Sequence, residues 1–328
     1  MNLCFYGAGA WGTALSSVAA LNHDAVLVAR DAKQASALSR DRENRRYLPG
    51  VALPPLLNIE HRLERVTGTL DLLVIATPLS GLRDACIAAR EHSDAPIVWL
   101  CKGIEQGSGL FPHEVVAEVH PNARGAVLSG PSFALEVARG QPTALTAASS
   151  DAALVDDIVR AFHSGALRVY GSHDLVGVEV GGAVKNVLAI AAGICDGLAL
   201  GLNARAALIT RGLSEMARLG AALGADPDTL MGLSGVGDLI LTCTGALSRN
   251  RRVGLSLGEG RALADILANL GHVAEGVLCA ESLAARAASL EVEMPITEAV
   301  CAILFKGQSA KDAVAGLLAR APRQELAP

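Results

Sequence analysis

A glycine-rich motif at the N-terminus constrains the fold more than any other feature of the sequence. Gly7, Gly9 and Gly12 form a G-x-G-x-x-G that follows a short apolar run at Leu3–Tyr6, and Thr13–Leu21 after it has the composition of a helix. In this strand–turn–helix context the first glycine makes a tight turn and the second lets a pyrophosphate approach the backbone. The third permits close packing of helix on strand, and the helix N-terminus faces the phosphates. The motif therefore predicts a dinucleotide-binding fold.

The end of the second predicted strand, Ala25–Ala29, discriminates between cofactors. An acidic side chain there would bond the ribose 2′-hydroxyl of NAD, whereas an arginine would accept the 2′-phosphate of NADP. The chain has both, Arg30 followed by Asp31. Because Arg30 directly continues the strand, we favour NADP over NAD. The simpler interpretation, in which Arg30 is only a solvated strand end, stays open.

Further apolar runs, separated by helical stretches, indicate a parallel sheet covered on both faces. They lie at Asp71–Thr77, Ile97–Cys101, Ala126–Ser129, Thr143–Ala148 and Leu167–Tyr170, whereas Asn44–Pro49 has the composition of a loop. Ligands of such sheets bind at the carboxyl ends of the strands. Lys102 and the turn at Gly130–Ser132 each follow a strand, so we expect them at the same crevice as the glycine motif. The alternative for Lys102 is an ordinary exposed lysine.

The character of the chain changes near Ser172, where alanine- and leucine-rich helical segments begin and continue to the C-terminus. A chain of 328 residues is longer than a single hydrophobic core usually accommodates, so two domains are expected. We predict an α/β fold in which a Rossmann-type doubly wound sheet is followed by an all-helical domain. The dinucleotide-binding domain would span 1–172 and the helical substrate and catalytic domain 173–328.

Lys185 lies in a segment, Val178–Cys195, that is apolar on nearly every side and therefore predicts a buried helix. Burial disfavours a charged ammonium and lowers its pKa, which suits proton transfer near neutrality. Gly181 lies one helical turn before Lys185, so another group can approach that face closely. The alternative is a core lysine whose amine reaches water.

The densest basic cluster in the chain follows a glycine-rich segment at 232–245. It reads Ser248-Arg249-Asn250-Arg251-Arg252. Arginines can hold a phosphate through charge-assisted, bidentate bonds, although a solvated helix start would have the same composition. Together with a dinucleotide fold and a buried lysine, the cluster suggests hydride transfer to the carbonyl of a phosphorylated substrate, with lysine as the acid.

Charge and cysteine usage exclude several other classes of function. The net charge is −5 and no long basic run is present, which argues against nucleic acid or an anionic membrane as the main partner. The seven scattered cysteines and eight histidines lack metal-site spacing, so no metal site is predicted. We expect a cytoplasmic protein with neither a signal peptide nor a membrane span.

The sequence resembles the bacterial NAD(P)-dependent glycerol-3-phosphate dehydrogenases over nearly its whole length. The resemblance rests on ordered motifs that include GAGAWGTAL at 7–15, YLPG at 47–50, ATPLSGLR at 76–83, CKGIE at 101–105, SGPSFALEVARGQPT at 129–143, EVGGAVKNVLAIAAGICDG at 179–197, SGVGDLILTCTGALSRNRRVG at 234–254 and VAEGV at 273–277. It implies a two-domain enzyme that interconverts dihydroxyacetone phosphate and sn-glycerol 3-phosphate for glycerophospholipid synthesis.

The resemblance also implies roles for individual residues. The general acid/base falls on Lys185. Substrate contacts fall on Lys102, Gly130, Ser132, Lys185, Asp238, Ser248, Arg249 and Asn250. Cofactor contacts, besides the three glycines, fall on Ala10, Trp11, Arg30, Tyr47, Lys102, Ala134, Arg249, Val273 and Glu275.

Two other functions fit part of the sequence. A reductase of the 2-ketopantoate or β-hydroxyacid type would share the glycine turn and the lysine but would not need the arginine cluster. A nucleotide-sensing protein without catalysis would explain the glycine turn but not Lys185. The expected partner is a small phosphorylated substrate. Association into a homodimer stays open.

Overall fold

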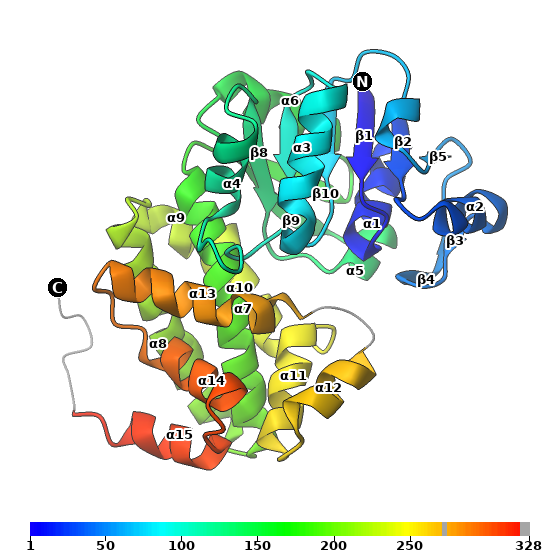
Figure 1. Cartoon of the computed structure of the whole chain (residues 1–328). Coiled ribbons are helices and arrows are strands. Elements are labelled where there is room, and N and C mark those ends of the chain that lie inside the picture. The colour runs from blue at the N-terminus through cyan, green and yellow to red at the C-terminus, as the bar shows by residue number, and fades with distance from the viewer. Residues whose placement is uncertain (271–273, 322–328) are drawn as a thin grey trace.

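A computed structural model describes residues 1–270 and 274–321 and shows a sheet-containing part joined to a helical part (Figure 1). The main sheet has the strand order β10-β9-β8-β7-β6-β1-β2-β5. Its strands are β1 (Asn2–Tyr6), β2 (Asp24–Val28), β5 (Asn58–Glu60), β6 (Leu72–Ile75), β7 (Ile97–Trp99), β8 (Gly125–Ser129), β9 (Thr143–Ala148) and β10 (Leu167–Ser172).

Helices cover both faces of this sheet, as the continuous apolar runs predicted. On one face, alternate residues such as Phe5 and Val74 pack against α1 (Ala10–Ala19), α2 (Ala32–Asp41) and α6 (Ala152–Phe162). On the other, Ile75 and Trp99 pack against α3 (Leu82–His92) and α4 (Pro112–Val119). The short α5 (Ala134–Ala138) packs against α1, and η1 (Leu63–Arg65) and η2 (Leu79–Gly81) are 3-10 turns.

The sheet departs from the sequence prediction in three places. β9 pairs antiparallel with β8, so the sheet is not wholly parallel. The segment predicted as a loop at Asn44–Pro49 belongs partly to an antiparallel pair, β3 (Glu43–Asn44) with β4 (Leu48–Ala52). β5 beside β2 was not predicted, because only three residues make it and none is fully buried. Strands β1, β2, β6, β7 and β8 remain parallel, so their carboxyl ends share one edge.

The described residues after β10 form helices, turns and loops only, which confirms the predicted helical C-terminal part. Its elements are α7 (Leu175–Gly197), α8 (Gly201–Ala222), α9 (Pro227–Met231), the π-helical turn η3 (Leu233–Gly237), α10 (Asp238–Thr244), α11 (Arg249–Gly258), α12 (Leu263–Leu270), α13 (Glu275–Ser289), α14 (Pro295–Phe305) and α15 (Ala310–Leu318). The division of the chain at 172/173 stays a prediction.

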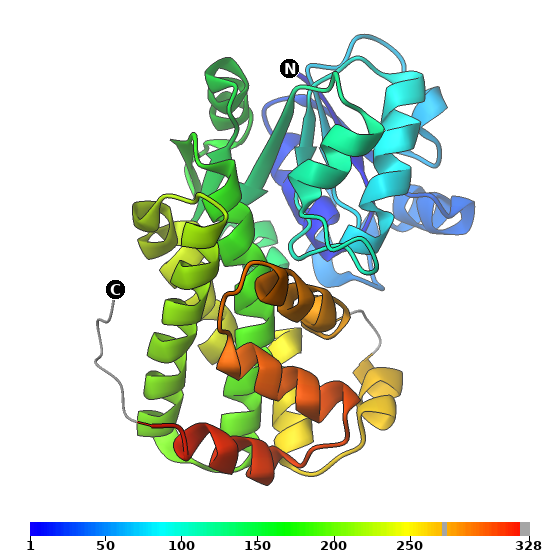
Figure 2. The same cartoon turned by 60° about the vertical axis from the view of Figure 1, so that its left-hand side comes forward.

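Helix α7 is the central element of the helical part, and the other helices surround it (Figure 2). Every residue from Gly177 to Cys195 is buried, as the apolar pattern predicted. By length and composition α7 could cross a membrane, but 89% of its apolar window is buried inside the protein. Val178 packs on the sheet, whereas Val184 and Leu188 belong to the helical core.

Candidate active site

The three glycines of the N-terminal motif have different surroundings in the structure. Gly7 has φ +122°, and a Cβ there would lie 2.8 Å from the carbonyl carbon of Ala76. A Cβ on Gly12 would lie 2.0 Å from the Gly7 carbonyl oxygen, whereas one on Gly9 would meet nothing within 4 Å. Gly7 and Gly12 are therefore required by the fold, while the space beside Gly9 is open.

Helix α1 begins at Ala10 and Trp11, with Gly9 as its N-cap and no capping side chain. The first N–H groups of a helix lack intrahelical acceptors, so they attract an anion. An open backbone at Gly9 together with an uncapped helix start fits the pyrophosphate of a dinucleotide. The residues present thus suit the cofactor that the motif predicted.

The strand end that was expected to select the cofactor leaves Arg30 exposed. Asp31 is the N-cap of α2, and its Oδ1 accepts a hydrogen bond of 2.9 Å from the Lys33 backbone N–H. Tyr47 lies under the Arg46 guanidinium, 5.0 Å from the ring centroid. Nearer the turn, the predicted cofactor contacts Trp11 and Ala134 pack against one small apolar cluster that contains Leu48.

A second group of predicted residues converges where α7 meets the carboxyl edge of the sheet. Lys185 Nζ donates to Asp238 Oδ1 at 2.5 Å and to Thr242 Oγ1 at 3.1 Å. Lys102 Nζ donates to the other carboxylate oxygen, Asp238 Oδ2, at 2.6 Å and to the Gly130 carbonyl at 3.1 Å. Asp238, at the start of α10, thus bridges two lysines that are far apart in sequence.

Gly130 directly follows β8 with φ +134°, and Ser132 Oγ donates to its carbonyl at 3.2 Å. The same carbonyl accepts from Lys102, so the predicted turn at 130–132 lies at the lysine pair. The backbone that approaches Gly181 is the protein's own, because a Cβ there would lie 2.3 Å from the Ser234 carbonyl oxygen. The space that the sequence left open at Gly181 is therefore filled by η3.

Burial and charge shift the proton affinities of this group. Burial lowers the pKa of Lys185 to about 8, with the Asp238 carboxylate opposing the shift and the Lys102 charge adding to it. Burial tends to raise the pKa of Asp238, but the two ammonium groups outweigh it and the pKa is lowered. Lys185 is therefore able to exchange a proton near neutrality beside an ionised carboxylate.

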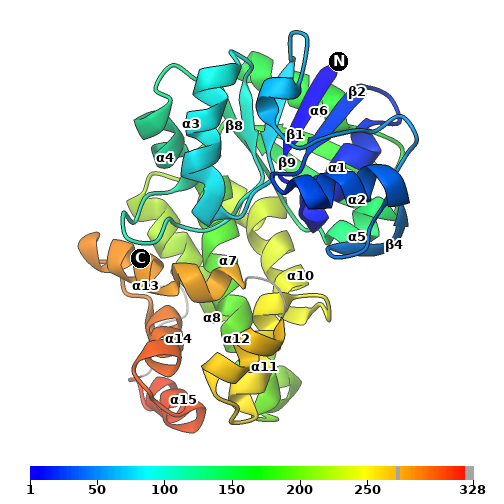
Figure 3. The ribbon, with the colours of Figure 1, turned by 45° about the vertical axis from the view of Figure 1, so that its right-hand side comes forward.

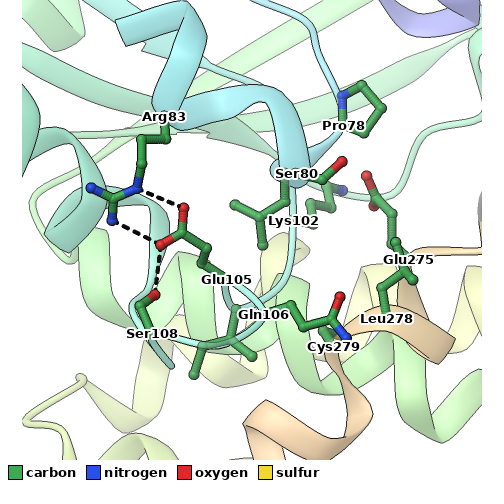
Figure 4. Close-up of a pocket in the computed structure, with 12 residues that line it drawn as sticks. Pro78, Ser80, Arg83, Lys102, Glu105, Gln106, Ser108, Glu275, Leu278 and Cys279 are labelled. Atoms are coloured by element: carbon green, nitrogen blue, oxygen red, sulfur yellow. Dashed lines mark hydrogen bonds and ion pairs between the residues drawn. The ribbon is translucent and has the colours of Figure 1, made fainter. Parts of the chain in front are cut away.

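Lys102 and Glu275 line one cavity of about 520 Å³ between the sheet edge and α13 (Figure 4). Glu275 is the first residue of α13, which lies next to α7 (Figure 3). Burial raises the pKa of Glu275, while Arg249, Lys185 and Lys102 oppose the shift. Figure 4 shows Glu275 facing the side of the cavity where Lys102 and Ser80 lie. At its other end Arg83 forms a forked ion pair with Glu105 at 3.1 and 2.8 Å.

The predicted phosphate cluster is divided by the geometry of α11. Ser248 is the N-cap, and its Oγ accepts from the Arg251 N–H at 3.2 Å. Arg249 is exposed, but Arg251 is committed to Asp196, with Nη2 2.6 Å from Oδ2. The expectation of a joint arginine site is therefore wrong for Arg251, because a residue two positions along a helix faces another way.

Asn250 is buried and joins three helices. Its Nδ2 donates to Asn186 Oδ1 at 3.0 Å, and its Oδ1 accepts from the Gly276 N–H at 3.0 Å. Neither Asn186 nor Thr242 was singled out from the sequence. Asn186 directly follows Lys185, and Thr242 lies one turn after Asp238, so adjacency to the named residues was the available signal. Val273 lies outside the described residues.

Comparison with known proteins tests the resemblance independently. The N-terminal and C-terminal domains of the NAD-dependent glycerol-3-phosphate dehydrogenase family match residues 2–155 and 174–315. The chain belongs to this family. It is therefore an NAD(P)-dependent glycerol-3-phosphate dehydrogenase by family, as the motifs implied.

Individual relatives agree along the whole chain. The glycerol-3-phosphate dehydrogenases [NAD(P)+] of Variovorax paradoxus and Methylibium petroleiphilum are 57% and 59% identical, each over 99% of this chain and over 99% and 98% of the relative. A crystal structure of glycerol-3-phosphate dehydrogenase from Coxiella burnetii is 39% identical, with a TM-score of 0.94 over 97% of this chain and 99% of that one.

The alternative reductase type shares the fold only. A ketopantoate reductase from Ralstonia eutropha superposes with a TM-score of 0.60 over 96% of this chain at 14% identity. The shared architecture explains why the glycine turn alone did not separate the two types in the sequence.

Proposed function

We propose that the chain interconverts dihydroxyacetone phosphate and sn-glycerol 3-phosphate with NADPH or NADH, in the cytoplasm, and supplies glycerophospholipid synthesis. The observation that carries this proposal is the bridging of Lys185 and Lys102 by the buried Asp238, together with the open glycine turn. The seven cysteines, all buried free thiols, are consistent with a reducing compartment. Formation of a homodimer stays a prediction, which sedimentation analysis would test.

Lys185 acts as the general acid in the reductive direction. Two of its three ammonium hydrogens bond to Asp238 and Thr242, which leaves the third for the substrate oxygen. A bound reduced nicotinamide would supply a hydride to the carbonyl carbon, which would leave negative charge on the oxygen. The ammonium stabilises that charge and transfers its proton to the oxygen, so the product is a hydroxyl and Lys185 becomes neutral. In the oxidative direction, neutral Lys185 removes the hydroxyl proton.

Asp238 keeps this chemistry electrically balanced. With Lys185 and Lys102 it makes a local net charge of +1, which favours an anionic substrate without leaving two buried ammonium groups uncompensated. Once Lys185 has released its proton, the Asp238 carboxylate remains paired with Lys102. Asp238 also holds Lys185 Nζ in place, and this reduces the reorganisation that the proton transfer requires.

Arg249 is the proposed partner of the substrate phosphate. It is exposed, and it is the first residue of α11, directly before the buried Asn250. Burial raises the pKa of Glu275, and the positive charge of Arg249 opposes this shift. A guanidinium fork grips two phosphate oxygens, and the helix N-terminus adds a favourable dipole. Ser248 and Asn250 complete the proposed phosphate site, while Ser132 and Gly130 lie with Lys102 on the sheet side.

The proposed cofactor preference is NADPH over NADH. Asp31 is occupied as the cap of α2, whereas Arg30 is exposed beside it at the end of β2. This arrangement leaves an arginine for a 2′-phosphate and engages the carboxylate that would select a 2′-hydroxyl. The remaining cofactor contacts proposed here are Gly7, Gly9, Gly12, Ala10, Trp11, Tyr47, Ala134, Val273 and Glu275.

The test is the oxidation of NADPH, followed by absorbance, with dihydroxyacetone phosphate and then with unphosphorylated keto acids such as ketopantoate. We expect activity with dihydroxyacetone phosphate and none with the keto acids. Lys185→Met, which retains the bulk of the side chain, should lower turnover at least about a hundredfold with cofactor binding nearly unchanged. Parental turnover in a folded variant would show that Lys185 is only a core lysine and would contradict the mechanism.

A further inference from the structure

Asn44 makes the most complete set of side-chain hydrogen bonds near the glycine turn, and no predicted role explains it. It is 2% exposed and lies in β3. Its Nδ2 donates to the Ala8 carbonyl at 3.1 Å and to Thr13 Oγ1 at 2.7 Å, and its Oδ1 accepts from the Tyr47 N–H at 3.3 Å. One amide thus connects the turn, helix α1 and the segment that carries Tyr47.

The bond to Ala8 determines how the turn presents its backbone. The Ala8 carbonyl and the Gly9 N–H belong to one planar, trans peptide, so they point in opposite directions. Two amides hold that carbonyl, Asn44 Nδ2 and Gln34 Nε2, the latter at 2.8 Å. Because both donors fix the carbonyl, the Gly9 N–H is directed away from them. Among the three glycines of the motif, Gly9 alone has open space beside it.

The bonds to Thr13 and Tyr47 align two further parts of the cofactor site. Thr13 is fully buried, and its N–H donates to the Gly9 carbonyl at 3.0 Å, so Asn44 holds the first turn of α1 from outside the helix. The Tyr47 N–H is bound twice by Asn44, through Oδ1 and through the backbone carbonyl at 3.2 Å. The β3–β4 pair therefore cannot shift without moving both the turn and Tyr47.

We propose that Asn44 is a positioning residue for cofactor binding, which orients the Ala8–Gly9 peptide toward the pyrophosphate and places Tyr47 at the same site. Asn44 acts through the backbone and does not touch the cofactor itself. The inference rests on the proposed assignment of the glycine turn as the pyrophosphate site. A residue of this kind affects the affinity for the dinucleotide while leaving proton transfer at Lys185 unchanged.

The test uses Asn44→Asp, which keeps the shape but removes both donors and sets a carboxylate oxygen against the Ala8 carbonyl. We expect the dissociation constant for NADPH, and for 2′-phospho-ADP-ribose, to rise about tenfold or more. Reduced nicotinamide mononucleotide, which lacks the pyrophosphate, should bind as it does to the parent. Turnover at saturating NADPH should stay within about twofold, because the lysine pair is untouched.

Two control variants calibrate the measurement. Gln34→Glu removes the other donor to Ala8 but touches neither Thr13 nor Tyr47, so we expect a smaller rise than for Asn44→Asp. Asn58→Asp makes the same chemical change at an exposed position of β5 and should leave NADPH affinity unchanged. If Asn44→Asp does not fold, Asn44→Ser, which retains one donor, gives the same comparison.

Parental affinity for NADPH in a folded Asn44 variant would overturn the proposal. So would an equal loss for all three ligands together with lost turnover, since that pattern indicates general damage to the fold. Gly9→Ala separates this failure from a failure of the assigned site, because its Cβ meets no protein atom within 4 Å. If Gly9→Ala binds NADPH as the parent does, the pyrophosphate lies elsewhere; if it binds weakly and Asn44→Asp does not, only the role of Asn44 is wrong.

Discussion

Replacing Asp238 by asparagine tests the electrostatic part of the mechanism. The carboxylate is 1% exposed and lies 2.5 Å from Lys185 Nζ and 2.6 Å from Lys102 Nζ. Asparagine has nearly the same shape, but it removes the negative charge that favours the protonated form of Lys185. The local net charge rises from +1 to +2, and the pKa of Lys185, about 8 in the parent, must fall.

The size of the effect follows from the contact distance. A charge pair separated by about 4 Å is worth about 4 kcal/mol at the effective dielectric constant of about 20 that suits protein sites. At 1.36 kcal/mol for each pKa unit, this corresponds to a fall of about three units. The protonated fraction of Lys185 at pH 7 would then drop from about nine-tenths to about one per cent. Reduction of dihydroxyacetone phosphate should slow by a similar factor.

The assay is kcat/KM for dihydroxyacetone phosphate between pH 5 and pH 9, since this ratio reports the free enzyme. Parental activity should decline as the pH rises through about 8, the pKa of Lys185, because the acid is then deprotonated. In Asp238→Asn the decline should begin at a lower pH and activity should recover toward pH 5.

Glu215→Gln provides the matched control, because it neutralises another buried carboxylate, one that caps α14 in the helical part and contacts neither lysine. Its pH–rate profile should match the parent. If Asp238→Asn loses activity by one factor at every pH, the carboxylate acts by geometry alone and the electrostatic reasoning is refuted.

Three further predictions address the phosphate site, the cofactor and the stability of the fold. Arg249→Ala should greatly reduce kcat/KM with dihydroxyacetone phosphate and much less with unphosphorylated dihydroxyacetone; equal proportional losses on the two substrates would assign Arg249 to the cofactor or the fold. Arg30→Ala should weaken NADPH by about 1.5–3 kcal/mol relative to NADH in binding titrations, and equal effects would exclude a 2′-phosphate contact. Burial raises the pKa of Glu215 from 4.5 to about 7, so ionising it costs the folded state about 3 kcal/mol as the pH rises from 4.5 through 7. Denaturant titrations should therefore show Glu215→Gln gaining stability relative to the parent across that interval, and a constant difference would contradict the assignment.

Local spacing made the strand–turn–helix around the glycine motif predictable. Gly7, Gly9 and Gly12 act within six residues of one another, and the physical demands on each depend on the adjoining strand and helix. Burial of Lys185 was equally readable, because its helix is apolar all round. These features depend on neighbours in sequence, which a single chain displays directly.

Features that depend on pairing between distant parts of the chain could not be predicted from the sequence. β9 is a half-buried run of alanine, threonine and leucine whether it pairs parallel or antiparallel, so its reversal against β8 left no mark in composition. Asp238 was identified by resemblance only, since nothing local links it to a lysine 53 positions away. The separation of Arg251 from Arg249 became clear only when Asp196 appeared beside α11.

The reversal of β9 and β10 determines where the central helix α7 begins. Both strands run opposite to β8, so α7 starts at the far edge of the sheet and passes along it toward the lysine pair. Its Glu179 accepts from Trp99 Nε1 at 2.8 Å and from the His113 N–H at 3.1 Å, which fastens the helix to β7 and α4. The same uninterrupted helix forms the centre of the helical core. Because α7 packs on the sheet through Val178 and on the helical core through Val184 and Leu188, a chain severed at 172/173 would expose apolar surface on both fragments.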